Sequence, residues 1–204
     1  MKLRRLLPLL LLTGLAGAVA GLFVAHMLTQ RTIALQGGTA LPEPRALRPF
    51  LLRDTAGRAF ANQALRGHPT LLYFGFTSCP DVCPATLAML RDLRRQALPA
   101  GLQVLFVSVD PERDTPAVLA QYLAAFSNEF IGLRPAPGAL APLLRNLSAF
   151  AGRKELPGGQ HAFDHSATLY LLDTQGRLAA VFTPPFTAAA MGADLRTLAS
   201  EAAL

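Results

Sequence analysis

The sequence predicts a mixed α/β domain, with a central sheet and helices on both of its faces, preceded by one N-terminal transmembrane helix. Two continuous apolar runs, residues 70–76 and 102–109, are typical of strands buried on both faces. Between them, residues 86–97 place apolar side chains at helical spacing. A strand, a helix and a second strand in this order imply a parallel pair with a right-handed crossover.

The first apolar segment, residues 6–28, contains no Asp, Glu, Lys or Arg, and its 23 residues exceed the roughly 20 that cross a bilayer. Basic residues precede it at Lys2, Arg4 and Arg5. Such a flank is typical of the cytoplasmic side. We therefore expect residues 1–30 to be a single-pass anchor in the inner (cytoplasmic) membrane, with the globular part on the periplasmic, extracytoplasmic side. The alternative is a cleaved signal peptide, because Ala18-Val19-Ala20 fits the small-residue cleavage pattern.

The composition allows one core-bearing domain, since 51% of the 204 residues are hydrophobic and 16% are charged. The formal net charge is +6, but four of the basic residues flank the apolar segment and leave only +2 for the remainder. They are Lys2, Arg4, Arg5 and Arg31. No later block of Lys and Arg with interleaved aromatics occurs, so we expect no nucleic-acid partner.

Residues 31–49 mix Gly, Pro and charged residues without periodicity, and we expect a tether there. The domain is expected to occupy residues 50–204 and to open with a short hairpin over 50–60. Two amphipathic helices are expected after the second buried strand, over residues 116–126 and 138–150. A strand hairpin over 166–172 and 178–182 follows, and a final helix begins at about Thr187. Together these elements predict an α/β sandwich of thioredoxin type.

Cys79 and Cys83 are the two cysteines of the chain. A bridge between residues four apart would close a very short loop and stabilise little. The strand over 70–76 delivers Cys79 to the carboxyl edge of the sheet, where open α/β sheets place their sites. Pro84 suits the first turn of the next helix, so Cys83 lies at a helix start, where the dipole and free N–H groups are expected to lower its thiol pKa. This spacing lets the two sulfurs either form a bridge or chelate one ion.

Two thiolates leave a metal short of ligands, so the four histidines become relevant. His165 begins the strand after the third helix, which in a thioredoxin-type sheet starts beside the Cys loop. We interpret His165 as the third ligand and His68, next to Pro69, as a loop residue. Asp164 either orients His165 or caps the strand.

The donor set identifies the metal. Two soft thiolates and one imidazole suit Cu(I), and the same set can hold Cu(II). A structural zinc site would need a fourth protein ligand, for which the chain offers no third cysteine. We therefore predict a copper ion bound by Cys79, Cys83 and His165.

Three segments carry a family likeness: Tyr73–Pro84 (YFGFTSCPDVCP), Val107–Pro116 (VSVDPERDTP) and Asp164–Ser166 (DHS). They resemble the Sco/SenC copper proteins involved in cytochrome c oxidase assembly, and the likeness runs from about Phe50 to the C-terminus. The resemblance implies a thioredoxin-like domain that binds copper through its two cysteines and its distal histidine. It also implies delivery of copper to, or reduction of the cysteines of, the binuclear copper site in an oxidase subunit. Other periplasmic copper chaperones and thioredoxin-like reductases are further implied partners.

His161 departs from that family, whose members commonly carry Tyr four residues before the ligand histidine. In a strand, positions 161 and 165 share a face, so His161 is a candidate auxiliary ligand or proton-dependent gate on metal release. We favour a third interpretation, a solvent-exposed loop histidine after Gly158-Gly159.

The segment Asp110–Pro116 also has two interpretations. It is either an acidic surface that docks a partner, or a turn followed by a helix cap built by Asp114 and Thr115. We favour the cap and leave docking open.

The predicted function is that of a copper metallochaperone. The alternative is a membrane-anchored thiol-disulfide oxidoreductase, or a redox or copper sensor, using the same cysteines. Three residues separate the cysteines, where thioredoxin-like reductases have two. Asp-His also precedes Ser166, where such enzymes place proline. Both differences argue against an enzyme.

Overall fold

The computed structural model describes residues 14, 17–21, 33–159, 161–201 and 204. The chain divides into two compact units, residues 1–33 and 34–204. The predicted anchor, residues 1–30, lies largely outside the described residues; those of its residues that are described are helical. In the part of the chain that the structure describes, no helix combines the length and apolar character needed to cross a membrane.

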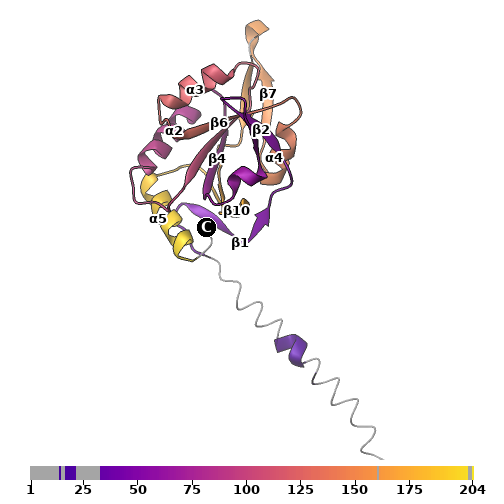
Figure 1. Ribbon diagram of the computed structural model, residues 1–204, viewed down its shortest axis with the longest axis vertical. Coiled ribbons are helices and arrows are strands. Elements are labelled where there is room, and N and C mark those ends of the chain that lie inside the picture. Colours follow the sequence, from indigo (N-terminus) through magenta and orange to yellow (C-terminus); the bar gives the residue numbers. More distant parts are fainter. Residues whose placement is uncertain (1–13, 15–16, 22–32, 160, 202–203) are drawn as a thin grey trace, which may run out of the picture. The chain divides into compact units, whose positions relative to one another are not determined.

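Residues 34–204 form two sheets. The strands are β1 (Gly38–Ala46), β2 (Leu51–Asp54), β3 (Ala59–Ala61), β4 (Thr70–Gly75), β5 (Gln103–Ser108), β6 (Phe130–Pro135), β7 (Ala151–Glu155), β8 (His161–His165), β9 (Leu169–Leu172) and β10 (Arg177–Phe182). Eight of them form a mixed sheet in the order β1-β10-β9-β4-β5-β6-β2-β3, and β7 pairs with β8 in a separate sheet (Figure 1). The central strands β4, β5 and β6 are parallel, as predicted for β4 and β5.

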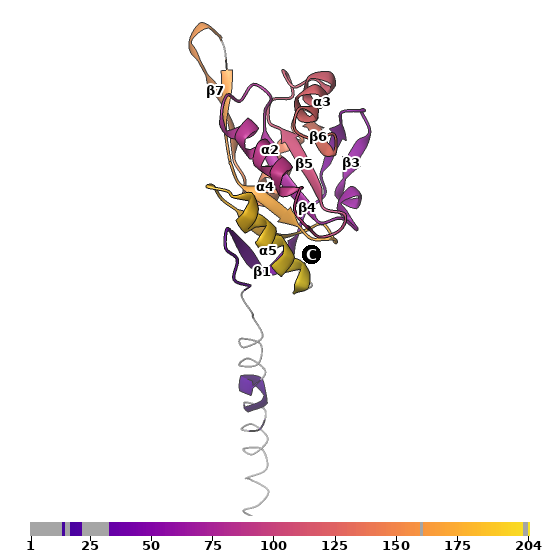
Figure 2. The ribbon, with the colours of Figure 1, turned by 90° about the vertical axis from the view of Figure 1, so that its left-hand side faces the viewer.

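Helices cover both faces of the large sheet. They are α2 (Val82–Leu93), α3 (Pro116–Ala124), α4 (Leu140–Leu147) and α5 (Ala188–Ser200), with 3₁₀ turns η1 (Asn62–Leu65) and η2 (Pro157–Gly159). Helices α2, α3 and α5 lie on one face and α4 on the other (Figures 1 and 2). The architecture is therefore the predicted thioredoxin-like α/β fold with a mixed sheet.

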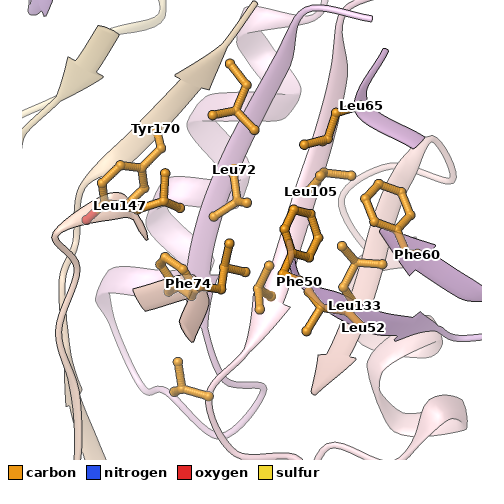
Figure 3. Close-up of a cluster of buried hydrophobic side chains, with 14 of the residues drawn as sticks. Phe50, Leu52, Phe60, Leu65, Leu72, Phe74, Leu105, Leu133, Leu147 and Tyr170 are labelled. Atoms are coloured by element: carbon orange, nitrogen blue, oxygen red, sulfur yellow. The ribbon is translucent and has the colours of Figure 1, made fainter. Parts of the chain in front are cut away.

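The alternation along β4 divides its side chains between the two faces. Leu72 and Phe74 point into the apolar cluster beneath α4, where Phe74 packs edge-to-face on Tyr170 at 5.9 Å between ring centroids (Figure 3). Tyr73 points to the opposite face, towards α2, where its hydroxyl reaches Cys83. Every residue of β4 is buried, which confirms the prediction of a strand covered on both sides.

Residues 31–49 were predicted to be a tether, but Gly38–Ala46 within this segment form strand β1, which pairs antiparallel with β10. Its ladder is interrupted between Ala40 and Arg45, where two prolines fall. Edge strands tolerate Pro and need no apolar periodicity, because backbone hydrogen bonds hold them. The absence of periodicity therefore concealed a strand.

Two further features were missed by the sequence analysis, which placed no strand at β6 and no hairpin at β7–β8. Gly132 and Pro135 interrupt the apolar pattern of β6. The β7 segment is Ala-Gly-Arg-Lys-Glu and is largely exposed, so it carries no apolar alternation. The β7–β8 hairpin extends away from the large sheet (Figure 2). The strand predicted to begin at Ser166 begins at Leu169.

Candidate metal centre

The two cysteines lie where β4 ends and α2 begins. The Cys79 N–H donates to the carbonyl oxygen of Phe76 at 3.2 Å, which turns the chain after the strand. Cys83 lies in the first turn of α2, and its backbone N–H donates to the Cys79 sulfur at 3.4 Å. Both are free thiols, Cys79 partly exposed and Cys83 buried. The helix start therefore directs one of its N–H groups at Cys79.

Burial controls the thiol of Cys83. Loss of solvent raises its pKa to about 12, so the predicted lowering of this pKa is wrong. The dipole of the helix start is outweighed because the sulfur is fully buried beside Gly75 and Phe106. The Tyr73 hydroxyl donates a long hydrogen bond to this sulfur at 3.8 Å. In the metal-free protein at neutral pH, Cys83 is a protonated thiol.

His165 meets Cys83 from β8. Its Nε2 lies 3.4 Å from the Cys83 sulfur, and its Nδ1 lies 3.1 Å from the carbonyl oxygen of Ser166. A carbonyl only accepts, so Nδ1 carries the proton and Nε2 presents its lone pair towards the sulfur. Burial also lowers the pKa of His165, which keeps the imidazole neutral. A neutral imidazole with a free Nε2 is the form that binds metals.

The ring of His165 is held by two aromatic neighbours. Tyr73 and Phe76 pack edge-on against it, with centroids 6.0 and 5.9 Å away. Such packing fixes the direction of Nε2.

One sulfur from each cysteine and one nitrogen from His165 all lie within 4.8 Å of one another. The structure thus brings together the three side chains that the sequence analysis selected. The predicted place of His165 in the fold is corrected: this residue ends a strand of the separate hairpin and does not begin a strand of the large sheet. Two thiolates and one imidazole suit a soft metal ion such as Cu(I).

Two other predicted residues lie apart from the chemistry. His68 is an exposed residue between η1 and β4, where its Nδ1 is 3.3 Å from the carbonyl oxygen of Gly101, so the loop interpretation is confirmed. Asp164 is exposed, and the Nδ1 of His165 is met by Ser166 instead. Asp164 is therefore not the group that orients the ligand ring.

The sequence analysis assigned Asp114 to the cap of α3, but in the structure Asp114 positions the cysteine loop instead. Thr115 alone caps α3, accepting from the Val118 N–H at 3.3 Å. Asp114 is fully buried and accepts from the backbone N–H and hydroxyl of Thr77, at 3.1 and 2.6 Å, and from the Ser108 hydroxyl at 2.5 Å. This carboxylate ties the loop before Cys79 to the end of β5. The sequence signal for this role was the pair of hydroxyl residues Thr77 and Ser108, which lie at the ends of the neighbouring strands β4 and β5.

His161 is not the exposed loop residue that the sequence analysis favoured. It begins β8, its side chain is 12% exposed, and its Nε2 lies 3.4 Å from the carboxylate of Asp110. Asp110 is 1% exposed and is paired with Arg113. Since Asp110 and Asp114 are both buried, they do not form an acidic docking surface. Polarity and the nearby glycines made a paired strand resemble a loop.

The fold and this site define a class: thioredoxin-like proteins with a metal centre of two cysteines, at the start of a helix, and one facing histidine. The chain belongs to the SCO1/SenC family, whose model matches residues 39–200.

Three relatives give the scale of the similarity. A SCO2-like protein of Rickettsia prowazekii is 36% identical over 133 residues, which cover 63% of this chain and 65% of the relative. The chain therefore spans just under two thirds of that relative's length. The structure of Bradyrhizobium japonicum ScoI with copper bound superposes with a TM-score of 0.67 and 37% identity, over 74% of this chain and 98% of that one. Yeast Sco1 with copper bound gives a TM-score of 0.69 and 30% identity, over 77% and 90%.

Proposed function

We propose that this protein is a copper metallochaperone that binds the ion through Cys79, Cys83 and His165 and delivers it to the binuclear copper site of cytochrome c oxidase. The observation that carries the proposal is the convergence of two sulfurs and one Nε2 within 4.8 Å. Family membership and the copper-bound structures of two relatives support it.

The geometry suits carriage of an ion rather than permanent retention. Three ligands satisfy Cu(I) while leaving room for a ligand from a partner, so copper passes between proteins by exchange of one ligand at a time. Cys79 and His165 are partly exposed while Cys83 is buried, so an incoming ligand reaches the ion beside the first two. The receiving partner is the copper-binding subunit of the oxidase.

The proposed location is the outer side of the cytoplasmic membrane. The uncharged segment 6–28 and the basic residues before it support a single-pass anchor with its N-terminus in the cytoplasm. A thiol pair that stays available for Cu(I) outside the cytoplasm needs a reductant, so thioredoxin-like reductases are proposed as further partners.

The proposal is tested by Cu(I) competition titration of the full chain. We expect one equivalent to bind tightly and His165→Ala to weaken binding by at least roughly 10- to 100-fold, because loss of a direct ligand should cost no less than loss of a group that orients one. His68→Ala is the matched control and should bind as the wild type does, since His68 is an exposed loop residue. Undiminished binding by His165→Ala would refute the three-ligand site.

A second assay separates delivery from catalysis. In a thiol-disulfide oxidoreductase the partly exposed Cys79 would attack, and a Cys83 thiolate would have to resolve the mixed disulfide, but burial keeps the Cys83 sulfur protonated. We therefore expect no catalytic reduction of an oxidised copper-site peptide by the metal-free protein, and transfer of Cu(I) to the reduced peptide. Multiple turnovers of disulfide reduction, abolished by copper, would favour the enzyme instead.

A further inference from the structure

The histidine ligand lies on the β7–β8 hairpin, whereas the cysteine ligands lie on the loop and the helix that follow β4 of the large sheet. β7 and β8 pair with each other, and neither strand joins the ladder of the large sheet in the described part of the chain. The position of His165 therefore depends on the short link from β8 to β9 and on side-chain contacts between the hairpin and the domain. At the base of the hairpin, Phe150 and Ser166 are joined by their backbones at 2.9 Å. The opposite end of β8 needs a contact of its own.

His161 makes that contact at the start of β8. Its Nε2 lies 3.4 Å from both oxygens of Asp110, which follows β5 of the large sheet. Asp110 is 1% exposed, and its backbone N–H donates to the Ser108 hydroxyl at 3.1 Å, so the acceptor is fixed. A further ion pair between hairpin and domain, Arg153 with Glu112 at 3.2 Å, is exposed and correspondingly weak.

A row of rings connects this contact to the metal centre. His161 packs edge-on against Phe163 at 5.8 Å between centroids, Phe163 packs against Phe76 at 6.0 Å, and Phe76 packs against His165 at 5.9 Å. Residues 161, 163 and 165 share the inward face of β8. Displacement of His161 therefore shifts the face that also carries His165.

Charged groups face His161 from both the hairpin and the domain. The carboxylates facing it are Asp110, Glu112 and, across the hairpin, Glu155, and the guanidinium groups are those of Arg113 and Arg153. Arg113 donates to one oxygen of Asp110, so His161 shares this carboxylate with a guanidinium group.

We propose that the contact between His161 and Asp110 is a proton-responsive clasp that holds the β7–β8 hairpin against the domain and so sets the position of His165. His161 acts as a positioning residue; it touches no metal. The inference rests on the proposed function, since the clasp tunes the affinity of the same three-ligand site. Protonation of His161 turns a hydrogen bond into an ion pair with a buried carboxylate, so the hairpin closes more firmly as pH falls.

The clasp is tested by amide hydrogen exchange in the metal-free full chain between pH 6.5 and 8. Above pH 6.5 the lowered pKa of His165 keeps that residue neutral, so its titration does not interfere. In the wild type, protection of the β7–β8 amides relative to β4 should increase as pH falls. His161→Phe retains the ring against Phe163 but removes the contact, and should lower this protection about tenfold at pH 6.5. Its protection should not change with pH.

A conservative variant and a matched control sharpen the test. His161→Gln can still donate to Asp110 but carries no charge, so its protection should match the wild type at pH 8 and stay constant below it. His68→Phe makes the same substitution at an exposed loop and should change nothing. Cu(I) affinity should fall about tenfold in His161→Phe at pH 6.5 and be restored in large part by His161→Gln.

Three results would overturn the clasp. One is unchanged hairpin protection in His161→Phe, and another is wild-type protection that does not vary with pH. The third is a second bound metal equivalent that His161→Phe abolishes, which would make His161 a ligand. A wild-type chain that fails to bind Cu(I) would refute the proposed function alone, because the exchange experiment on the metal-free chain still decides whether the clasp exists.

Discussion

At the scale of single residues, the metal ligands differ in the proton each must release. His165 is already neutral, because burial lowers its pKa and Ser166 holds the proton on Nδ1. Cys83 holds its proton firmly, because burial raises its pKa to about 12. A thiolate is the form that coordinates a metal, so binding must displace this proton.

We therefore predict that Cu(I) binding releases at least one proton at neutral pH. Below the raised pKa of Cys83, each displaced proton makes the apparent affinity rise about tenfold per pH unit. Competition titrations from pH 6.5 to 8.5 should thus give a slope of one or more in a plot of log affinity against pH. Cys83→Ser should lower both the affinity and the slope. A flat plot for the wild type would contradict the buried, protonated thiol.

At the scale of elements, the approach of α2 to β4 depends on the glycine that ends the strand. A Cβ added to Gly75 would lie 2.9 Å from the Cys83 sulfur and 2.7 Å from the ring of Phe106. Both neighbours are fully buried, so neither can move away freely. The glycine therefore allows the first turn of α2 to place its cysteine directly against the sheet.

Gly75→Ala should damage stability and the metal centre together. Overpacking of this kind costs roughly 1–3 kcal/mol, and the displaced sulfur should weaken Cu(I) binding. The measurements are the free energy of unfolding from urea denaturation and a Cu(I) competition titration.

Gly132→Ala provides the matched control for that experiment. The added Cβ would meet Leu119 and Leu123 of α3 at 2.8 Å, on an element that holds no ligand. We expect a comparable loss of stability with unchanged Cu(I) affinity. Equal affinity losses in the two variants would mean that destabilisation alone, and not the position of Cys83, explains the effect of Gly75→Ala.

At the scale of the whole domain, residues before the predicted boundary close one edge of the sheet. The carboxylate of Asp194 in α5 is 2% exposed and accepts from the backbone N–H groups of Gln36, Gly37 and Gly38 at 2.7, 2.8 and 3.0 Å. These bonds place the chain so that β1 pairs with β10. The domain therefore includes the segment that leads into it.

Asp194→Ala should lower the free energy of unfolding by about 1–3 kcal/mol, because three donors lose a charged acceptor. Cu(I) affinity should stay unchanged, since Asp194 contacts β1 rather than the metal centre. Asp92→Ala, at an exposed carboxylate of α2, is the control and should change stability by less than about 0.5 kcal/mol. If Asp194→Ala were as stable as the wild type, the backbone hydrogen bonds between β1 and β10 alone would hold β1 in place.

How much of this could be predicted depended on whether apolar periodicity marked the element. The strands β4 and β5 and the cysteine loop were predictable because their runs are continuous and end in a reactive pair. The edge strand β1 and the hairpin β7–β8 were not, since polar backbone pairing leaves no such pattern. The ligand His165 was found, but its route to the site and the partner of His161 were not, because both depend on that hairpin.

Because His165 lies on the β7–β8 hairpin and both cysteines follow β4 of the large sheet, the metal itself has a mechanical role. An ion bound to Cys79, Cys83 and His165 links the hairpin to the large sheet across a boundary that no described backbone ladder crosses. Loss of the histidine alone would remove the link between the ion and the hairpin while both sulfurs still hold the ion. A receiving protein could then supply the missing nitrogen or sulfur before either cysteine lets go, so that copper is never released into solution during transfer.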